Sequence, residues 1–276
     1  MIETCLRRSA LYVPCANQKA LSKVPSIDVD VIILDLEDAV AQQDKANARE
    51  QLKTFLMQKH PCQGELIVRI NALDTPWGYD DLTLLANLSI DGICIPKLET
   101  QQAVNEVLAI VGRTIPIWGN IETPLGVMQI EQIVSHDAVV AILMGVNDLA
   151  HAMRLPSNDD PTPFNYAFGH CIMAARAYDC DILDGVYNHF KDQSGFIAAC
   201  ERAKQWGFDG KTLIHPSQIE PTHQCFKPSQ QEYQAALNIM KAYELEGDKG
   251  ILVVDGRIVE ALHIAQAKRT IAYYGH

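Results

Sequence analysis

The chain has 276 residues, of which 48% are hydrophobic and 21% charged, and its formal net charge at pH 7 is -11. This is the profile of a globular protein with enough apolar material for one large core. The acidic balance argues against nucleic acid as a partner, because binding phosphates draws on a basic surface. No apolar run approaches the ~18 residues that span a bilayer, and the first residues lack the apolar stretch of a signal peptide. We therefore expect a cytoplasmic protein with no membrane partner.

Eight short apolar runs bounded by turn or polar residues are predicted strands, and most are separated by segments with helical spacing. In chain order the predicted strands are 10–14, 29–36, 66–71, 92–96, 115–121, 139–144, 182–187 and 212–215. Strands that alternate with helices pair in parallel, and eight such units indicate a closed barrel. The sequence thus predicts an α/β fold, a (β/α)₈ TIM barrel over residues 1–226.

Helical spacing is found between the strands and again in the last fifty residues. The predicted helices of the barrel are 44–58, 100–111 and 125–134. Near the end of the chain, helices predicted at 230–245 and 261–273 flank two short strands, 250–254 and 257–259, around the turn Asp255-Gly256. Residues 227–276 are therefore predicted to form a helix-hairpin-helix extension that contacts a neighbouring subunit.

The eight cysteines include no C-x-x-C pair, and several lie inside apolar segments. This pattern favours buried reduced thiols over disulfides or a zinc site. The cysteines are at positions 5, 15, 62, 94, 171, 180, 200 and 225.

Polar residues repeatedly follow the predicted strands. In a barrel of this kind the carboxyl ends of the strands form the active face. Taken singly, such a residue is more often a helix cap or turn former. Together, several carboxylates would point at one mouth, which is unfavourable unless a cation joins them. The segments are 35–38, 69–71, 96–97, 122–123, 147–148, 187–188 and 215–216.

Two of these acids, Glu122 and Asp148, are candidate ligands of Mg²⁺, which prefers oxygen ligands and keeps several waters. Ligation rich in histidine or cysteine is missing, so zinc fits poorly. The alternative is a pair of structural carboxylates bonded to backbone amides.

With these segments in place, the chain resembles the citrate lyase beta-subunit / malyl-CoA lyase superfamily, most closely its citramalyl-CoA lyase-like branch. The likeness covers nearly the whole chain in order. It is carried by residues 8–14, 33–40, 68–71, 96–97, 121–123 with Gly126, 147–149, 210–211 and 214–219.

The resemblance implies a Mg²⁺-dependent TIM barrel, a homotrimer or homohexamer, that acts on a CoA or carrier-protein thioester. By matching position, Glu122 and Asp148 would be the metal ligands and Arg69 would hold the substrate oxygens. Glu37 and Asp38 would order the waters and Arg69 around them. The implied reaction cleaves or forms a 3-hydroxyacyl-CoA, such as citramalyl-CoA or malyl-CoA, from acetyl-CoA and a 2-oxo acid through a metal-stabilised enolate.

The general base of the family resembles an Asp delivered by the adjacent subunit, and here Glu260 stands at that position. The longer side chain matters, since a misplacement of about 1 Å can cost ~100-fold in rate. Glu260 is either the base in an adjusted site, the support of a different reaction such as thioester hydrolysis, or a surface acid in a weak paralogue.

Other departures affect the expected cofactor and substrate contacts. Cys15 replaces a usual Gly beside the expected thioester site, Asn147 replaces an acid, and Phe168 stands in place of an Arg. Arg8 and Lys19 are candidates for pairing with CoA phosphates, with a solvated basic face as the alternative.

Three other functions stay open beside the carbon-carbon lyase. They are a citryl-carrier lyase beta-like subunit, a malyl-CoA thioesterase, and a CoA-binding paralogue with little catalysis. The sequence does not choose between malyl, methylmalyl and citramalyl groups, since one methyl is discriminated by only ~1–3 kcal/mol.

Overall fold

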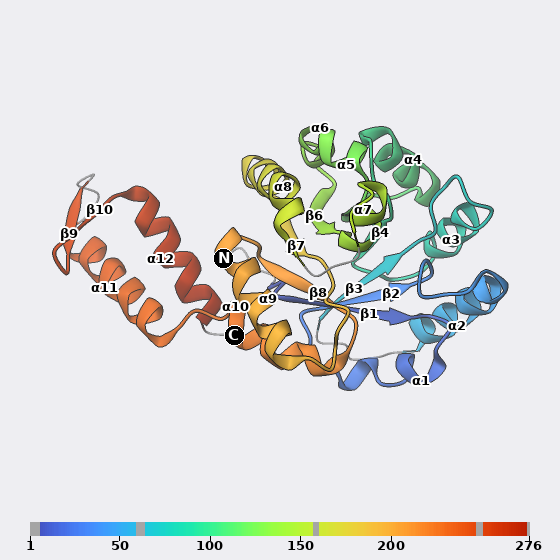
Figure 1. Cartoon of the computed structure of the whole chain (residues 1–276), viewed down its shortest axis with the longest axis horizontal. Coiled ribbons are helices and arrows are strands. Elements are labelled where there is room, and N and C mark those ends of the chain that lie inside the picture. The colour runs from blue at the N-terminus through green and yellow to red at the C-terminus, as the bar shows by residue number, and fades with distance from the viewer. Residues whose placement is uncertain (1–5, 59–63, 157–159, 247–250, 275–276) are drawn as a thin grey trace. The chain divides into compact units, whose positions relative to one another are not determined.

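The computed structural model describes residues 6–58, 64–156, 160–246 and 251–274 (Figure 1). The chain divides into two compact units, Arg7–Thr222 and His223–His276, the latter with Met1–Leu6. This division falls shortly before the domain boundary predicted between residues 226 and 227. The contact predicted between the extension and a neighbouring subunit stays a prediction.

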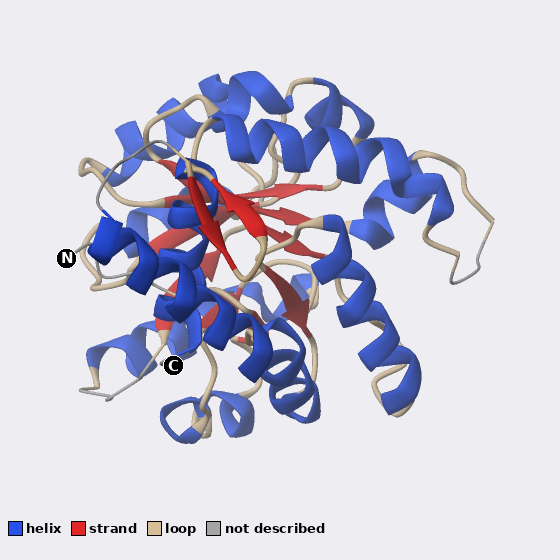
Figure 2. Cartoon of the chain, turned by 90° about the vertical axis from the view of Figure 1, so that its left-hand side faces the viewer, coloured by secondary structure: helices blue, strands red, loops and turns tan. Residues whose placement is uncertain are grey.

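Eight parallel strands close the first unit into a barrel, with β1 hydrogen-bonded to both β2 and β8. Figure 2 shows the strands in red with helices in blue around them. The predicted (β/α)₈ fold is thereby confirmed. The strands are β1 Ser9–Pro14, β2 Val31–Asp35, β3 Glu65–Arg69, β4 Gly92–Ile95, β5 Ile117–Ile121, β6 Val139–Met144, β7 Asp181–Asp184 and β8 Gly210–Leu213.

The interior of the barrel is filled by side chains from alternate positions of the strands, because successive residues of a strand point to opposite faces. The filling is apolar and is buried throughout. Its members are Ala10, Val31, Ile33, Ile67, Cys94, Trp118, Ala141, Leu143 and Leu183. Since this core is packed, charged side chains gather at the ends of the strands.

Helices connect the strands and pack around them. Helix α4 shows why they form: Thr100 caps its first turn by accepting from the N–H of Ala103, and Gly112 ends it at φ +70°. The helix predicted at 125–134 is two helices, because Gln129 (φ -102°, ψ 8°) leaves the helical region. The helices of the barrel are α1 Gln18–Leu21, α2 Lys45–Met57, α3 Gly78–Leu85, α4 Gln101–Val111, α5 Pro124–Met128, α6 Ile130–Val134, α7 Val146–Ala152, α8 Asn165–Ala177 and α9 Gln193–Trp206. Helix α10 Ile219–Phe226 spans the division between the two units. Short 3-10 turns are η1 Val24–Ser26, η2 Gln42–Asp44, η3 Thr162–Phe164 and η4 Pro216–Gln218.

The second unit is the predicted helix-hairpin-helix, α11 Gln230–Glu246, β9 Leu252–Val254, β10 Arg257–Val259 and α12 Ala261–Tyr274. Its strands pair antiparallel around Asp255 and Gly256, whose φ angles of 50° and 75° suit the tight turn of a hairpin. The two helices are joined by stacked rings of Tyr233 and Tyr274, whose centroids lie 3.9 Å apart. Gly250, the predicted start of the first strand, lies outside the described residues.

The described cysteines are all free, as predicted, and five of the six are buried. Cys225 is half-buried, and Cys5 and Cys62 lie outside the described residues. Among the helices that the structure describes, none is long and apolar enough to cross a membrane.

Candidate active site at the barrel mouth

Charged side chains gather at the carboxyl ends of β2, β3, β5 and β6. Glu37 and Asp38 follow β2, and Arg69 is the last residue of β3. Glu122 follows β5, and Asp148 lies in the first turn of α7, directly after β6. The structure therefore brings five of the predicted site residues to one end of the barrel.

Arg69 is held in one orientation by the acids around it. Its Nε and Nη2 donate to the two carboxylate oxygens of Asp35 at 2.8 and 2.7 Å. Its Nη1 lies 3.0 Å from Glu37 Oε2 and 3.6 Å from Asp38 Oδ2, and the guanidinium carbon lies 4.6 Å from the ring centroid of Tyr12. Burial is the largest single influence and lowers the pKa of Arg69, but the neighbouring groups, led by Asp35, together outweigh it and the pKa is raised. One edge of the guanidinium is thus fixed by Asp35, and the other faces Glu37 and Asp38.

Glu37 is a carboxylic acid whose charge is costly here. Burial is the main cause that raises its pKa to about 7, and repulsion from Asp38 and Asp35 adds to it against the attraction of Arg69. The side chain of Asp38 is by contrast 56% exposed.

Glu122 is buried, with only 2% of its surface exposed. Its Oε1 accepts from the backbone N–H of Lys97 at 2.8 Å, and its Oε2 accepts from Asn120 Nδ2 at 2.5 Å. Burial, and next the charge of Glu37, raises the pKa of Glu122 to about 8. Gly145 makes room for it, since a Cβ at that position would lie 2.3 Å from Glu122 Cβ.

Asp148 and Lys97 lie between the buried Glu122 and the solvent at the barrel mouth. The Asp148 side chain is 39% exposed, and its Oδ1 lies 3.8 Å from Lys97 Nζ. Lys97 adopts a left-handed backbone conformation (φ 47°) while its N–H binds Glu122. Burial is the largest single influence and lowers the pKa of Lys97, but the nearby acids, led by Glu37 and Asp148, together outweigh it and the pKa is raised.

The donor set at the mouth fits Mg²⁺. Glu122 and Asp148 supply hard carboxylate oxygens. Burial, and next the charge of Glu37, makes the ionised form of Glu122 costly, and a divalent cation would offset this cost. Among the described residues, no group of three or more His, Cys, Asp or Glu side chains is arranged to hold a metal. The two acids would therefore share the ion with water and substrate oxygens, as Mg²⁺ prefers.

Lys45, a buried residue at the start of α2, anchors the loop that carries Glu37 through hydrogen bonds. Lys45 Nζ donates to the carbonyl oxygens of Leu36 and Glu37, each at 2.8 Å, and to Asn71 Oδ1 at 2.6 Å. Asn71 Nδ2 in turn donates to the fully buried Asp81 at 2.7 Å. This chain of bonds fixes the β2–α2 loop against β3 and α3.

The structure does not bring Arg8 to the mouth. Arg8 precedes β1, at the opposite end of the barrel, and its Nε and Nη2 bind the two carboxylate oxygens of Asp30 at 2.9 and 2.8 Å. Because that carboxylate already binds the fork of its guanidinium, Arg8 has no position from which to meet CoA at the mouth. Lys19 is exposed on α1, which follows the carboxyl end of β1. Glu260 is exposed in the second unit, directly after β10, and its approach to the mouth stays a prediction.

Two residues of the site, Lys45 and Asn120, lie outside the segments that the sequence placed at the mouth. Asp35 and Lys97 lie within those segments but were given no role of their own. Asp35 and Asn120 are polar residues inside apolar strands, which is the signal that marks them. Lys97 follows a strand, which is a weaker signal. Lys45 carries no signal in one sequence, because a lysine opening a helix is ordinarily solvated.

Known proteins share this architecture and much of the sequence. The chain is 41% identical to a (3S)-malyl-CoA thioesterase of Cereibacter sphaeroides, over 96% of the chain and 93% of the relative. It is 32% identical to the citrate lyase subunit beta of Escherichia coli (strain K12), over 98% and 94%. It superposes on the CitE protein of Mycobacterium tuberculosis, a structure in complex with magnesium, acetoacetate and coenzyme A, with a TM-score of 0.83, 25% identity and full coverage of both chains.

The match to a family extends over most of the barrel, from residue 8 to residue 216. This range contains Arg69, Glu122 and Asp148 as well as the loop of Glu37 and Asp38. The chain belongs to the HpcH/HpaI aldolase/citrate lyase family, whose members act on CoA thioesters as lyases or thioesterases.

Proposed function

We propose that this protein is a Mg²⁺-dependent carbon-carbon lyase that cleaves a 3-hydroxyacyl-CoA, such as malyl-CoA or citramalyl-CoA, into acetyl-CoA and a 2-oxo acid. One observation carries the proposal. Two acids from neighbouring strands, Glu122 and Asp148, lie at the same barrel mouth as the fixed guanidinium of Arg69.

Glu122 and Asp148 would hold the metal ion. When bound, Mg²⁺ supplies Lewis-acid polarisation of substrate oxygens, worth several kcal/mol in the transition state. Lys97 keeps Glu122 in place through its backbone N–H, and Gly145 leaves room for that side chain.

Arg69 would bind the carboxylate or the oxygen that gains negative charge. Its bidentate pair with Asp35 fixes the guanidinium before substrate arrives, and preorganised donors of this kind stabilise developing charge without reorganisation. Glu37 and Asp38 lie at the edge of Arg69 that does not bind Asp35, where they would orient the guanidinium and the water around it.

Cleavage also needs a base for the substrate hydroxyl. The base takes the hydroxyl proton, and the hydroxyl carbon becomes the carbonyl of the 2-oxo acid as the carbon-carbon bond breaks. The electron pair of that bond passes to the thioester fragment, and the resulting enolate takes a proton to become acetyl-CoA. Glu260 is the candidate base, reaching the mouth of a second copy in a homotrimer or homohexamer. The unit of Glu260 supports such contact, because it exposes large apolar side chains, namely Leu245, Ile251, Val253, Ile258 and Leu262.

Lys19 stays the candidate for a CoA phosphate, since it is exposed on α1 at the mouth end of β1. Arg8 is left out of this proposal, because it is paired with Asp30 at the other end of the barrel.

Hydrolysis of the same thioester is the second candidate, favoured by the 41% identity to (3S)-malyl-CoA thioesterases. It would use the same binding groups for malyl-CoA and would release malate and free CoA. The citryl-carrier lyase subunit would need a carrier-protein thioester, and a paralogue with little catalysis would release neither product.

The deciding experiment incubates the full chain with Mg²⁺ and malyl-CoA and separates the products by chromatography. Acetyl-CoA and glyoxylate support the lyase, whereas malate and free thiol in their place support the thioesterase. Absence of turnover with both malyl-CoA and citramalyl-CoA overturns both. Glu122→Gln should lose roughly 100-fold or more of the rate, while Glu201→Gln, an exposed acid on α9, should keep it.

A further inference from the structure

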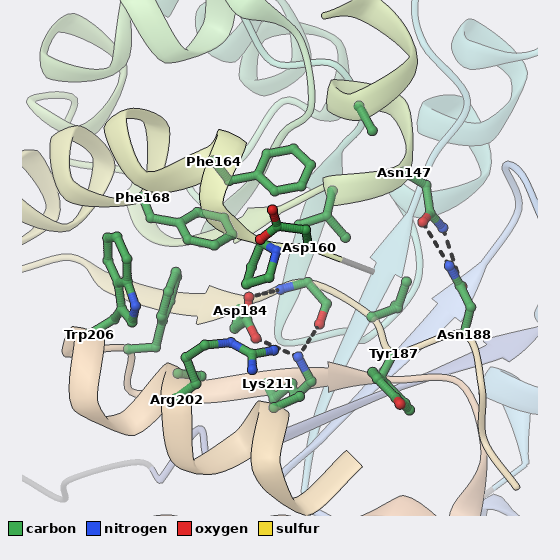
Figure 3. Close-up of a pocket in the computed structure, with 18 residues that line it drawn as sticks. Asn147, Asp160, Phe164, Phe168, Asp184, Tyr187, Asn188, Arg202, Trp206 and Lys211 are labelled. Carbon is green, nitrogen blue, oxygen red and sulfur yellow. Dashed lines mark hydrogen bonds and ion pairs between the residues drawn. The ribbon is translucent and has the colours of Figure 1, made fainter. Parts of the chain in front are cut away.

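A second hollow lies beside the barrel wall, between β7, β8 and helices α8 and α9 (Figure 3). Its volume is about 170 Å³. The strand residues that line it point outward, because Leu183 belongs to the barrel interior and Asp184 is the next residue of the strand. Lys211 pairs with Asp184 across β7 and β8 and shares this outer face. The cavity is therefore outside the barrel.

One side of the cavity is aromatic. The ring of Phe168 stacks on Phe164 with centroids 5.5 Å apart, and it meets Trp206 and Phe208 edge-on at 5.7 and 5.3 Å. All four rings line the cavity. Such a wall accepts a flat or branched apolar group.

The floor of the cavity is a buried ion pair that is already neutral. Lys211, whose side chain is 3% exposed, donates to Asp184 and to the carbonyl oxygen of Gly185, the latter at 2.7 Å. The other oxygen of Asp184 accepts from the N–H of Gly185 at 2.8 Å. This pair leaves no strong charge for an occupant to neutralise.

Arg202 is the second cationic residue of the cavity, and unlike Lys211 it is not paired with a carboxylate among the described residues. It extends from α9 along the same hollow (Figure 3), and no hydrogen bond or ion pair joins it to another of the described residues. Asp160 also lines the cavity, with its Oδ1 accepting from the N–H and hydroxyl of Thr162. A guanidinium fork without a partner beside an aromatic wall suits a carboxylate attached to an apolar body.

We propose that this cavity is a binding site for a small monocarboxylic acid, whose apolar body packs on Phe168 and Trp206 and whose carboxylate binds Arg202. The size sets the class of ligand, since a cavity of about 150 Å³ holds benzene. A ring or branched chain of six or seven heavy atoms with one carboxylate therefore fits, whereas a nucleotide such as CoA does not.

The site adjoins the mouth but differs from it. Asn147, the neighbour of Asp148, lines the cavity and exchanges hydrogen bonds with Asn188, at 2.9 and 3.4 Å. Binding in the cavity uses neither Glu122 nor Arg69, so it should not need Mg²⁺.

The test is titration calorimetry of the full chain with benzoate, and with benzyl alcohol and benzylamine as neutral and cationic probes of the same size. Benzoate should bind at least tenfold more tightly than either. Arg202→Gln should weaken benzoate by ~10- to 100-fold, the loss for a charged hydrogen bond. The control is Arg113→Gln, which changes an exposed arginine that is distant from Arg202 in the sequence and donates to the Leu88 carbonyl oxygen. It should leave the benzoate affinity unchanged.

A cavity-filling variant checks the location independently. Ala203 lines the cavity from α9, so Ala203→Leu should exclude benzoate while circular dichroism shows the fold retained. Equal binding of benzyl alcohol and benzoate, no benzoate binding, or equal affinity in the Arg202 and Arg113 variants would overturn the proposal. So would a benzoate affinity that disappears in EDTA, because this would place the ligand at the mouth.

Discussion

Replacing Glu122 with glutamine should flatten the dependence of the barrel's stability on pH. Burial and the nearby charge of Glu37 raise the pKa of Glu122 to about 8 from its ordinary 4.5. A raised folded pKa gives stability that is complete below the unfolded pKa and is lost as pH rises through the folded value. The whole loss is roughly 5 kcal/mol, and about 3 kcal/mol of it falls between pH 6 and pH 8.5.

Tryptophan emission measures this effect on the barrel alone, since all three tryptophans, Trp77, Trp118 and Trp206, lie within Arg7–Thr222. In EDTA the midpoint of thermal unfolding should fall by roughly 6–12 °C from pH 6 to pH 8.5. Glu122→Gln should lose the larger part of this fall, and the part that remains comes from Glu37, whose pKa of about 7 lies in the same pH range. The control Glu201→Gln, an exposed acid on α9, should keep it.

Mg²⁺ should also affect the pH dependence, because an ion that binds ionised Glu122 competes with the proton for that carboxylate. Added Mg²⁺ should raise the unfolding midpoint more at pH 8.5 than at pH 6, and this difference should vanish in Glu122→Gln. A Glu122→Gln variant that keeps the pH slope of the parent in EDTA would show that the pH dependence does not arise from the buried charge of Glu122.

Three further changes test the supports of the site. Lys45→Met should lower kcat/KM by roughly 10- to 100-fold, because Lys45 holds the loop that carries Glu37 and Asp38. Calorimetry and circular dichroism check the Mg²⁺ affinity and the fold of this variant. Lys53→Met changes an exposed lysine of the same helix and should leave kcat/KM and Mg²⁺ affinity unchanged. Gly145→Ala should weaken Mg²⁺ at least tenfold, because its Cβ would meet the Glu122 carboxyl oxygen at 2.5 Å. Glu260→Gln should lose ~100-fold or more in turnover at unchanged Mg²⁺ affinity, and turnover equal to the parent's would remove Glu260 as the base.

The barrel could be predicted because its signals are local and repeated. Each strand is an apolar run that ends at a polar residue, and the alternation with helices fixes parallel pairing. The same regularity predicted that Glu122 and Asp148 would share an end of the barrel, since each follows a strand directly. The gathering of side chains at the mouth is thus a consequence of topology.

What the sequence did not predict depends on which partner each side chain meets. Arg8 precedes β1 and Arg69 ends β3, yet Arg8 pairs with Asp30 at the end of the barrel opposite the mouth and Arg69 pairs with Asp35 at the mouth. Lys45 resembles any helix-opening lysine until its three acceptors are seen. Pairing between side chains distant in sequence leaves no periodic trace, so such roles need coordinates.

The balance of charge at the mouth gives a physical reason for a cation there. Among the described residues, the ion pairs of the five carboxylates at the mouth involve two cationic side chains, Arg69 and Lys97. The carboxylates are Asp35, Glu37, Asp38, Glu122 and Asp148, and Glu122 is held by a backbone N–H instead of a cationic side chain. An excess of acid is unfavourable in a partly buried site. Burial is the main cause of the raised pKa values of Glu37 and Glu122, and repulsion from neighbouring acids adds to it. A divalent ion cancels more of the excess than protons on either acid alone. A divalent ion held by Glu122 and Asp148 would relieve this repulsion, which gives a physical reason for a metal at the mouth.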